Sequence, residues 1–431
     1  MHLYQRWREI AAANADEWAL REAHRSWTFR ELQAELDTLP VATAPVILQG
    51  RNAAFVLGTL QAWRDGQLAV PVEEGVIFDA ERAELASVPE GIVHVKTTSG
   101  STGTPRHILF TAEQLAADTQ QIISTMGLRR EWPNVGVISL AHSYGFSNLV
   151  LPLLLHGIPL ILVGDPLPET MRRALARGES QSDGFTIPAV PAMWRTWQSA
   201  GILDACRVKL GISAGAPLPP KLELAMFEAC GLKVHNFLGA SECGGISYDR
   251  TDHPRPLDSD WIGSAMEGVS LSVGSSGTLC VKSAAVGQAY WPQPDNTALS
   301  GEGTFQTSDL VRLEASSEVY LLGRADDVIN VSGRKVHPGE IELLLNSQAD
   351  ILSSVVFSVP SANALRGEDM VVLVNLRAGA EVAKVKQELA NDLAGAEWKL
   401  PRRWYIEPQL ATDQRGKISR AGWKARFLDR K

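Results

Sequence analysis

Short apolar, β-prone segments alternate with helical segments through the first half of the chain. Residues 46–48, 68–72 and 92–96 have the composition of buried strands, and residues 53–63 and 111–127 have that of helices. Further strands are expected at residues 135–140, 160–163 and 208–212. Such alternation is typical of βαβ units, in which helices cover both faces of a parallel sheet. We therefore predict an α/β fold with mostly parallel sheets.

Local signals place several of these elements. Residues 18–28 have the pattern of a hairpin, and capping boxes at Thr28–Glu31 and Thr111–Gln114 mark two helix starts. The second of these helices is expected to end at Gly127, because glycine readily adopts the left-handed conformation of a C-cap.

The composition changes twice toward the C-terminus. Residues 257–322 are rich in glycine, serine and short β-prone runs, which indicates a small β region. Beyond Asp326 the pattern becomes α+β, with helices at residues 338–345 and 382–394 and strands at 355–359 and 371–376. We therefore predict a large N-terminal domain, residues 1–325, and a small mobile α+β domain, residues 326–431.

The bulk properties exclude some classes of function. The 431 residues carry 41 Lys and Arg against 49 Asp and Glu, and this net charge of −8 argues against a nucleic-acid partner. The four cysteines have no metal-binding spacing, and the N-terminus lacks the apolar core of a signal peptide. The apolar residues 148–164 are too short for a membrane span and are interrupted by His156, Gly157 and Pro159. We expect a cytoplasmic protein with no membrane span.

A glycine- and hydroxyl-rich loop, residues 98–103, follows the strand predicted at 92–96. Glycines allow backbone N–H groups to converge on an anion, and Ser and Thr hydroxyls add donors. The loop lacks the Lys-Ser/Thr pair of a Walker A motif. It predicts a phosphate site, and a surface turn is the alternative interpretation.

Three charged residues further along suit a nucleotide. Glu242 could hold Mg²⁺ against a triphosphate, or it could be a solvated loop carboxylate. Asp309 could accept hydrogen bonds from ribose hydroxyls, with Arg324 as a nearby donor. A turn residue and a surface ion pair are the alternatives for these two.

In this order, the segments resemble the adenylate-forming superfamily of acyl-CoA synthetases, peptide-synthetase adenylation domains and luciferases. The resemblance extends over nearly the whole chain. The matched segments are Thr98–Pro105, Ala214–Pro217, Gly239–Glu242, Thr307–Asp309, Gly323–Asp327, Ser332–Val336 and Gly416–Arg420.

The resemblance implies a two-step reaction: ATP and a carboxylate give an acyl-adenylate and pyrophosphate, and a thiol then displaces AMP. It implies that Lys417 bridges the acyl carboxylate and the α-phosphate, that Glu242 holds Mg²⁺, and that His142 lies near the acyl pocket. A packed histidine at a strand end is the alternative for His142. Asp326 stands where the family's small domain rotates. The implied ATP-binding residues are Thr98, Ser99, Gly100, Ser101, Thr102, Gly103, Arg106, Ala214, Gly215, Ala216, Gly239, Ala240, Ser241, Asp309 and Arg324.

The chain departs from the family pattern in places. Arg106 stands where lysine is usual, and Leu238 replaces the aromatic residue that stacks on adenine. The region before the glycine loop is shorter than usual.

The expected function is an AMP-forming carboxylic acid ligase. Residues 185–191 lack the aspartate that amino-acid-binding relatives carry, so we expect an aryl or acyl acid without an α-amine. The acceptor is coenzyme A or the phosphopantetheine of a separate acyl carrier protein, since no carrier domain follows Lys431. A non-catalytic binding relative and a luciferase-type oxygenase are the alternatives.

Overall fold

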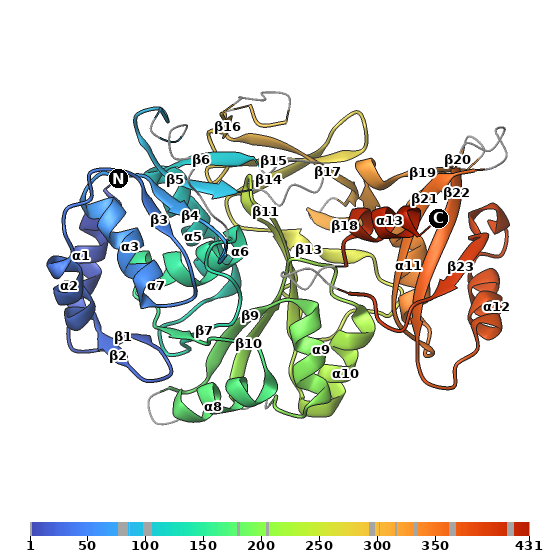
Figure 1. Cartoon of the computed structure of the whole chain (residues 1–431), viewed down its shortest axis with the longest axis horizontal. Coiled ribbons are helices and arrows are strands. Elements are labelled where there is room, and N and C mark those ends of the chain that lie inside the picture. The colour runs from blue at the N-terminus through green and yellow to red at the C-terminus, as the bar shows by residue number, and fades with distance from the viewer. Residues whose placement is uncertain are drawn as a thin grey trace.

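A large mixed sheet runs through most of the molecule (Figure 1). The computed structural model describes residues 2–75, 85, 87–97, 106–178, 182–203, 207–292, 298–300, 302–314, 317–331, 334–361, 368–411 and 418–430. Within these residues the sheet has 13 strands. Their spatial order is β14 (Val269–Val273), β15 (Thr278–Ser283), β17 (Thr304–Leu313), β18 (Glu318–Arg324), β13 (Trp261–Ala265), β12 (Gly244–Tyr248), β11 (Val234–Ala240), β10 (Val208–Ser213), β9 (Phe185–Ala189), β7 (Asn134–Gly136), β8 (Leu160–Leu162), β1 (Trp18–Arg21) and β2 (Ser26–Thr28).

The large sheet has a parallel part and an antiparallel part, and the edge pair β1–β2 is antiparallel as well. Pairs from β1 through β8, β7, β9 and β10 to β11 are parallel, as the βαβ pattern predicts. From β11 to β12 and onward every pair is antiparallel. The β-prone residues 257–322 therefore mainly extend the same sheet. The reversal lies at the turn between β11 and β12.

A second sheet has five strands in the order β16 (Ala289–Trp291), β6 (His107–Thr111), β5 (Ile92–Thr97), β4 (Ala69–Pro71) and β3 (Val46–Leu48). The three strands β3, β4 and β5 are parallel to one another. Strand β16 comes from the β-rich stretch and pairs with β6, so that stretch contributes to both sheets.

Helices cover the two sheets and share one large apolar core with them. They are α1 (Leu3–Ala13), α2 (Phe29–Thr38), α3 (Ala53–Arg64), α5 (Ala112–Met126), α6 (Ser143–Gly145), η1 (Phe146–Val150), α7 (Leu151–His156), α8 (Pro168–Gly178), α9 (Pro191–Ser199) and α10 (Pro220–Cys230).

The predicted helix signals are confirmed. Thr28 and Thr111 each make a complete capping box, and Gly127 is left-handed with a φ of 66°. The apolar residues 148–164 fold as a buried helical segment, a left-handed turn at Gly157 and β8. In the described part of the chain, no helix has both the length and the hydropathy needed to cross a bilayer.

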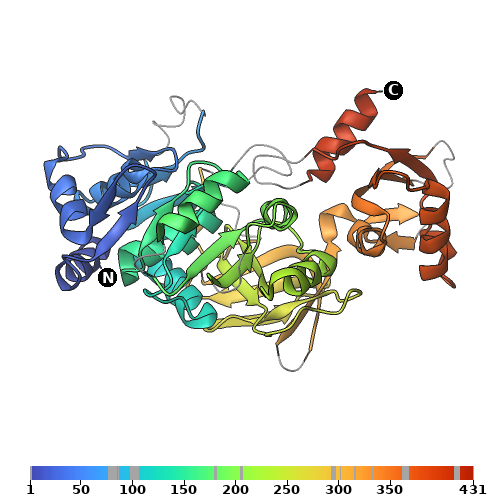
Figure 2. The ribbon, with the colours of Figure 1, turned by 90° about the horizontal axis from the view of Figure 1, so that it is seen from below.

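The residues after β18 form their own sheets and cores at one end of the molecule (Figure 2). The elements are η2 (Ala325–Asp327), β19 (Ile329–Val331), β20 (Arg334–Val336), α11 (Pro338–Ser347), β21 (Ile351–Pro360), β22 (Glu368–Leu376), α12 (Val382–Asp392), η3 (Glu397–Lys399), β23 (Arg403–Ile406) and α13 (Arg420–Asp429). The sheet β21-β22-β23 is covered on both faces. Val372 and Val374 pack with α11 and α12, and Val371 and Leu373 pack with α13, because successive strand residues point to opposite faces.

Two long polar side chains of the larger part contact this C-terminal part. Arg195 of α9 donates to the carbonyl oxygen of Leu352 at 3.3 Å. Lys221 of α10 donates to that of Gln348 at 3.2 Å. The predicted boundary at residues 325 and 326 lies within η2, the connection between β18 and β19.

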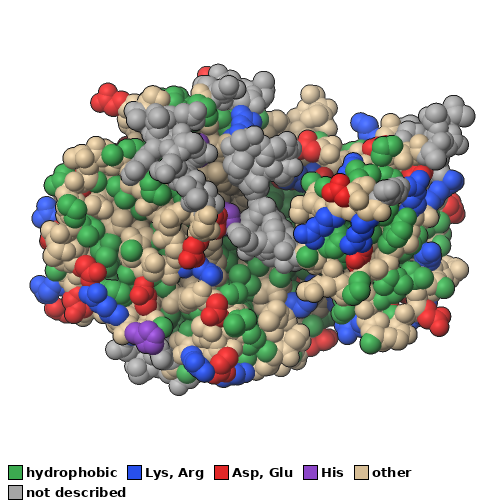
Figure 3. Space-filling view, viewed as in Figure 1, with side chains coloured by type: hydrophobic (Ala, Val, Ile, Leu, Met, Phe, Trp, Pro, Cys, Tyr) green, Lys and Arg blue, Asp and Glu red, His purple; other side chains and the backbone are tan. Residues whose placement is uncertain are grey.

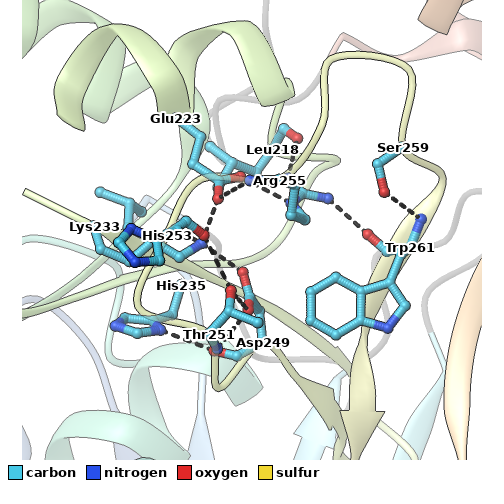
Figure 4. A network of polar contacts seen from close by, with 11 residues as sticks. Leu218, Glu223, Lys233, His235, Asp249, Thr251, His253, Arg255, Ser259 and Trp261 are labelled. Atoms are coloured by element: carbon cyan, nitrogen blue, oxygen red, sulfur yellow. Dashed lines mark hydrogen bonds and ion pairs between the residues drawn. The ribbon is translucent and has the colours of Figure 1, made fainter. Parts of the chain in front are cut away.

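A buried cluster of four charged side chains joins α10 to β11, β12 and the loop that follows β12 (Figure 4). Glu223 binds both Lys233 and Arg255, and Lys233 also contacts Asp249 at 2.5 Å. Arg255 donates to the carbonyl oxygens of Leu218 and Trp261, at 2.8 and 2.9 Å. All four charged residues are at most 8% exposed. The cluster therefore fixes the residues that follow β10 and β12.

We predict that Glu223→Gln lowers the free energy of unfolding by about 3 kcal/mol, because the substitution leaves the Arg255 guanidinium buried without its carboxylate. Urea denaturation measures this loss. Asp16→Asn is the control, since Asp16 pairs with Arg30 on the open surface and exposed pairs stabilise little. Equal losses in the two variants would contradict the prediction.

Candidate active site

The turn between β11 and β12 carries the predicted segment Gly239–Glu242. β11 is the last parallel strand of the large sheet, and the turn lies at its carboxyl end. In open α/β sheets, ligands bind outside the carboxyl ends of parallel strands. Gly239 and Ala240 end β11, and Ser241 and Glu242 form the turn itself.

Glu242 is the centre of a set of contacts between both sheets. Its Oε1 accepts a hydrogen bond from the hydroxyl of Tyr290, on β16, at 3.0 Å. The guanidinium carbon of Arg106 lies 3.6 Å from the centre of the Tyr290 ring. Burial raises the pKa of Glu242 above its usual range, and the Tyr290 hydrogen bond and the charges of Arg324 and Arg106 act in the opposite direction. Glu242 and Arg106 thus both contact Tyr290, and the charge of Arg324 acts on Glu242.

A buried ion pair lies beneath this site. Lys96, next to the end of β5, contacts Asp118 of α5 at 2.9 Å and Ser147 at 3.1 Å. The Ser147 hydroxyl donates to the same Asp118 carboxylate at 2.5 Å. Gly244, two residues after Glu242, has a φ of 69°, and a Cβ there would lie 2.2 Å from Asp118 Oδ1. The pair thus joins the strand before the glycine loop to the turn that carries Glu242.

We predict that Gly244→Ala destabilises the protein by a few kcal/mol, because the added methyl group collides with the Asp118 carboxylate. Gly66→Ala is a matched control: Gly66 has a φ of 66°, but a Cβ there meets nothing within 4 Å. The control pays only the left-handed backbone cost of about 1–2 kcal/mol. Urea denaturation compares the two variants. Equal decreases in the free energy of unfolding would show that the Asp118 side chain moves aside at no energetic cost.

Asp309 and Arg324 are directly opposite each other on β17 and β18. The Arg324 guanidinium hydrogen-bonds to Ser308 and lies 3.6 Å from the carboxylate of Asp326. The backbone N–H of Asp309 donates to the hydroxyl of Thr307 at 3.0 Å. The structure therefore places the two predicted ribose ligands side by side.

His142 lies at the start of α6, a short helix near the ends of β9, β10 and β11. The neighbouring Ser143 hydroxyl is 3.0 Å from that of Ser241. The Tyr144 hydroxyl donates to the carbonyl oxygens of Ala189 and Ile212, at 3.4 and 3.3 Å. The Nε2 atom of His142 is 3.3 Å from Oε1 of Glu73. The segment that carries His142 thus borders the Glu242 turn.

The predicted adenine-side loop Ala214–Ala216 follows the carboxyl end of β10. The backbone N–H of Ala214 donates to the carbonyl oxygen of Ala189 at 3.2 Å. Gly215 has a φ of 84°, which favours glycine, and is exposed. This loop and the Glu242 turn lie at the ends of neighbouring parallel strands.

Some predicted residues lie outside the described part of the chain: Thr98, Ser99, Gly100, Ser101, Thr102, Gly103 and Lys417. The described residues next to them are well anchored. Thr97 and His107, at the two ends of the glycine segment, are linked by a 3.2 Å hydrogen bond. Ile418, the residue after Lys417, packs against the core formed by α13 and β21 to β22.

Sequence reasoning missed Tyr290, Lys96, Asp118 and Glu73. A signal for Asp118 existed, because this charge occurs on the helix face that carries Leu115 and Ile122, and a charge there must be paired. Tyr290 has no such signal, since only the pairing of β16 with β6 places it beside Glu242. Trp194 and Trp197 are fully buried in the large apolar core.

The sequence matches the family described as AMP-binding enzyme over residues 59–291, more than half of the chain. The chain therefore belongs to that family, and the predicted membership of the adenylate-forming enzymes is confirmed.

Named relatives agree with this class. A 2-hydroxy-7-methoxy-5-methyl-1-naphthoate–CoA ligase from Streptomyces carzinostaticus is 26% identical over 96% of this chain and 76% of its own length. A long-chain-fatty-acid–CoA ligase from Bacillus subtilis (strain 168) is 24% identical over 79% of this chain, which spans 63% of that relative. The crystal structure of the anthranilate CoA ligase AuaEII with anthranoyl-AMP has the same fold, with a TM-score of 0.83 at 17% identity, covering 100% of this chain and 98% of that one.

Proposed function

We propose that this protein is an AMP-forming ligase that activates a carboxylic acid with ATP and passes the acyl group to a thiol. The observation that carries the proposal is the convergence of Glu242, Arg106 and Arg324 at the carboxyl end of β11. An acid ligase must bring a carboxylate against a triphosphate, and such a step requires positive charge and a metal site in one place.

In the first step, an oxygen of the acid attacks the α-phosphorus of ATP, and the bond to pyrophosphate breaks. Arg106 and the segment Thr98–Gly103 would hold the departing phosphates. Asp309 would accept hydrogen bonds from the ribose hydroxyls, with Arg324 beside it. The loop Ala214–Ala216 and the residues Gly239–Ser241 would border the adenine.

Glu242 is a suitable ligand for Mg²⁺. The described residues contain no group of three or more His, Cys, Asp or Glu side chains that could hold a metal ion. Mg²⁺ bound to a nucleotide commonly uses one or two protein carboxylates together with phosphate oxygens and waters. A single carboxylate whose protonation is favoured by burial fits such a site, because a cation would replace the proton. When bound, Mg²⁺ neutralises phosphate charge.

Two neighbouring aspartates in the connection to the C-terminal part pair with different parts of the molecule. Asp326 faces Arg324 on β18, whereas Asp327 pairs with Arg420 at the start of α13. Arg420 also binds Glu342 of α11 at 2.8 Å. A rotation centred on Asp326 would therefore leave Asp327 with the C-terminal part, which we propose as a mobile domain carrying Lys417.

In the second step, the thiol sulfur attacks the acyl carbon and AMP leaves. Residues 326–431 carry 16 Lys and Arg against 14 Asp and Glu. Residues 1–325 carry 25 Lys and Arg against 35 Asp and Glu, so the C-terminal part is the more basic of the two. Figure 3 shows Lys and Arg side chains on the face of the C-terminal part beside the larger part. Positive charge there would favour an anionic acceptor, either coenzyme A or the phosphopantetheine of a carrier protein.

An aromatic acid is the substrate class that we propose. The described residues near His142 include the ring of Tyr144, whose centre is 5.9 Å from that of Phe237. Two of the proteins compared above have aromatic acids in their names, and the third has a fatty acid. The ring of an aromatic acid would pack favourably against such aromatic side chains.

We predict acid-dependent pyrophosphate release with ATP and Mg²⁺ for aryl acids, and a fall of at least about 100-fold in Lys417→Ala, because an electrostatic partner of the transition state is removed. Pyrophosphate release is measured with a panel of aryl and aliphatic acids, and Lys424→Ala is the control substitution. Activity on aliphatic acids alone would contradict the substrate class. ATP binding without release would favour a non-catalytic relative.

Asp309→Asn is expected to raise the KM for ATP by about tenfold, because a neutral amide accepts hydrogen bonds less strongly than a carboxylate. The KM for the acid should change by less than twofold. Steady-state kinetics, with ATP and the acid varied in turn, measures the two KM values. Asp260→Asn, on the loop before β13, is the control. Equal changes in both KM values would place Asp309 outside the ribose site.

A further inference from the structure

Polar side chains that follow three strands from two different sheets meet beside His142. Gln49 follows β3, Glu73 follows β4, and Ser139 follows β7. The Ser139 hydroxyl donates to Oε1 of Glu73 at 2.7 Å, and Nε2 of His142 lies 3.3 Å from the same oxygen. The Gln49 amide donates to the carbonyl oxygen of Glu73 at 3.5 Å. One carboxylate oxygen thus receives two partners from the large sheet.

The contact is at the border of the site and not in the core. The side chains of His142 and Glu73 are 32% and 29% exposed, whereas those of the buried pair Lys96 and Asp118 are 2% and 1% exposed. A carboxylate that is partly open to water contributes little to stability through an ion pair. Stabilisation of the fold therefore does not account for the position of the Glu73 carboxylate beside His142.

Another residue already ties the same two regions. Arg51, which follows β3, donates to the carbonyl oxygen of Val137, directly after β7, at 2.9 Å. The large apolar core also joins both sheets. The connection between the ends of β3 and β7 does not require Glu73.

The contact gives the His142 ring a carboxylate partner at Nε2. A carboxylate beside a ring nitrogen holds the proton on that nitrogen and sets the ring's orientation. On its other side, His142 is next to Ser143, whose hydroxyl is 3.0 Å from that of Ser241, the neighbour of Glu242. The His142 ring therefore contacts the residue after β4, and its chain neighbour Ser143 contacts the turn that carries Glu242.

We propose that Glu73, assisted by Ser139, is a positioning residue that orients the His142 ring against the carboxylic acid substrate. This inference rests on the proposed ligase function. Glu73 acts on the acid through His142 and has no part in binding ATP. Substitution of Glu73 therefore impairs the use of the acid and leaves ATP binding unchanged.

The first test is the kinetics of pyrophosphate release in Glu73→Ala. We expect kcat/KM for the acid to fall about 10- to 100-fold, by analogy with the loss of a hydrogen-bond partner behind a metal-binding histidine. The KM for ATP should stay within twofold, which a general loss of structure would not allow. Glu74→Ala is the matched control, because Glu74 is the adjacent, exposed carboxylate. Its kcat/KM should equal that of the wild type.

A double-mutant cycle with His142→Ala decides whether Glu73 acts through the histidine. If it does, Glu73→Ala causes no further loss in the His142→Ala background. Glu73→Gln keeps an oxygen that can accept from Nε2, so it should retain more activity than Glu73→Ala. Calorimetric titration of the acid, without ATP, gives a readout that is independent of turnover.

The outcomes separate the two proposals. An active wild-type enzyme in which Glu73→Ala keeps full kcat/KM, or in which the two substitutions have independent effects, would overturn the role of Glu73 alone. Equal rises in both KM values would likewise overturn it. A wild-type protein that releases no pyrophosphate with any acid would overturn the ligase function, and this inference with it.

Discussion

The contact between Lys96 and Asp118 is the interaction on which the candidate site depends. Lys96 lies just before the glycine loop, and Asp118 lies against Gly244, two residues beyond Glu242. Ser147 of η1 completes the group. A charge buried in an apolar core is tolerated only when it is paired and hydrogen-bonded. The pair thus links β5 to α5 and packs closely against Gly244, so a buried ion pair supports both the strand before the glycine-rich segment and the turn that carries Glu242.

The sequence predicted the elements and the class of fold because both depend on short-range patterns. The capping boxes at Thr28 and Thr111 and the left-handed Gly127 are local features, and all three are present. The parallel arrangement of β7 to β11 follows from the βαβ pattern. The extension of that sheet by antiparallel strands could not be predicted, because no local signal specifies which strands pair.

The candidate site was predictable only in part, for the same reason. Glu242, Asp309 and Arg324 occur in ordered motifs, and in the structure Asp309 lies opposite Arg324, whose charge acts on Glu242. Tyr290 and Glu73 occur in no such motif. They reach the site because the second sheet packs beside the first, with β16 on β6 and β4 between β3 and β5. Side chains supplied by the packing of one sheet against another leave no periodic trace in the sequence.

Arg420 joins the connection after β18 to α11 and to the start of α13. Its guanidinium binds Asp327 and Glu342, and α13, which it begins, packs on β21 and β22 through Trp423 and Phe427. Asp327, α11 and the start of α13 are therefore joined through one guanidinium, in addition to the apolar packing of α13. Under the proposed rotation at Asp326, these elements would move together. The orientation of the residues after Lys417 then depends on an ionic contact as well as on apolar packing, outside the proposed substrate site.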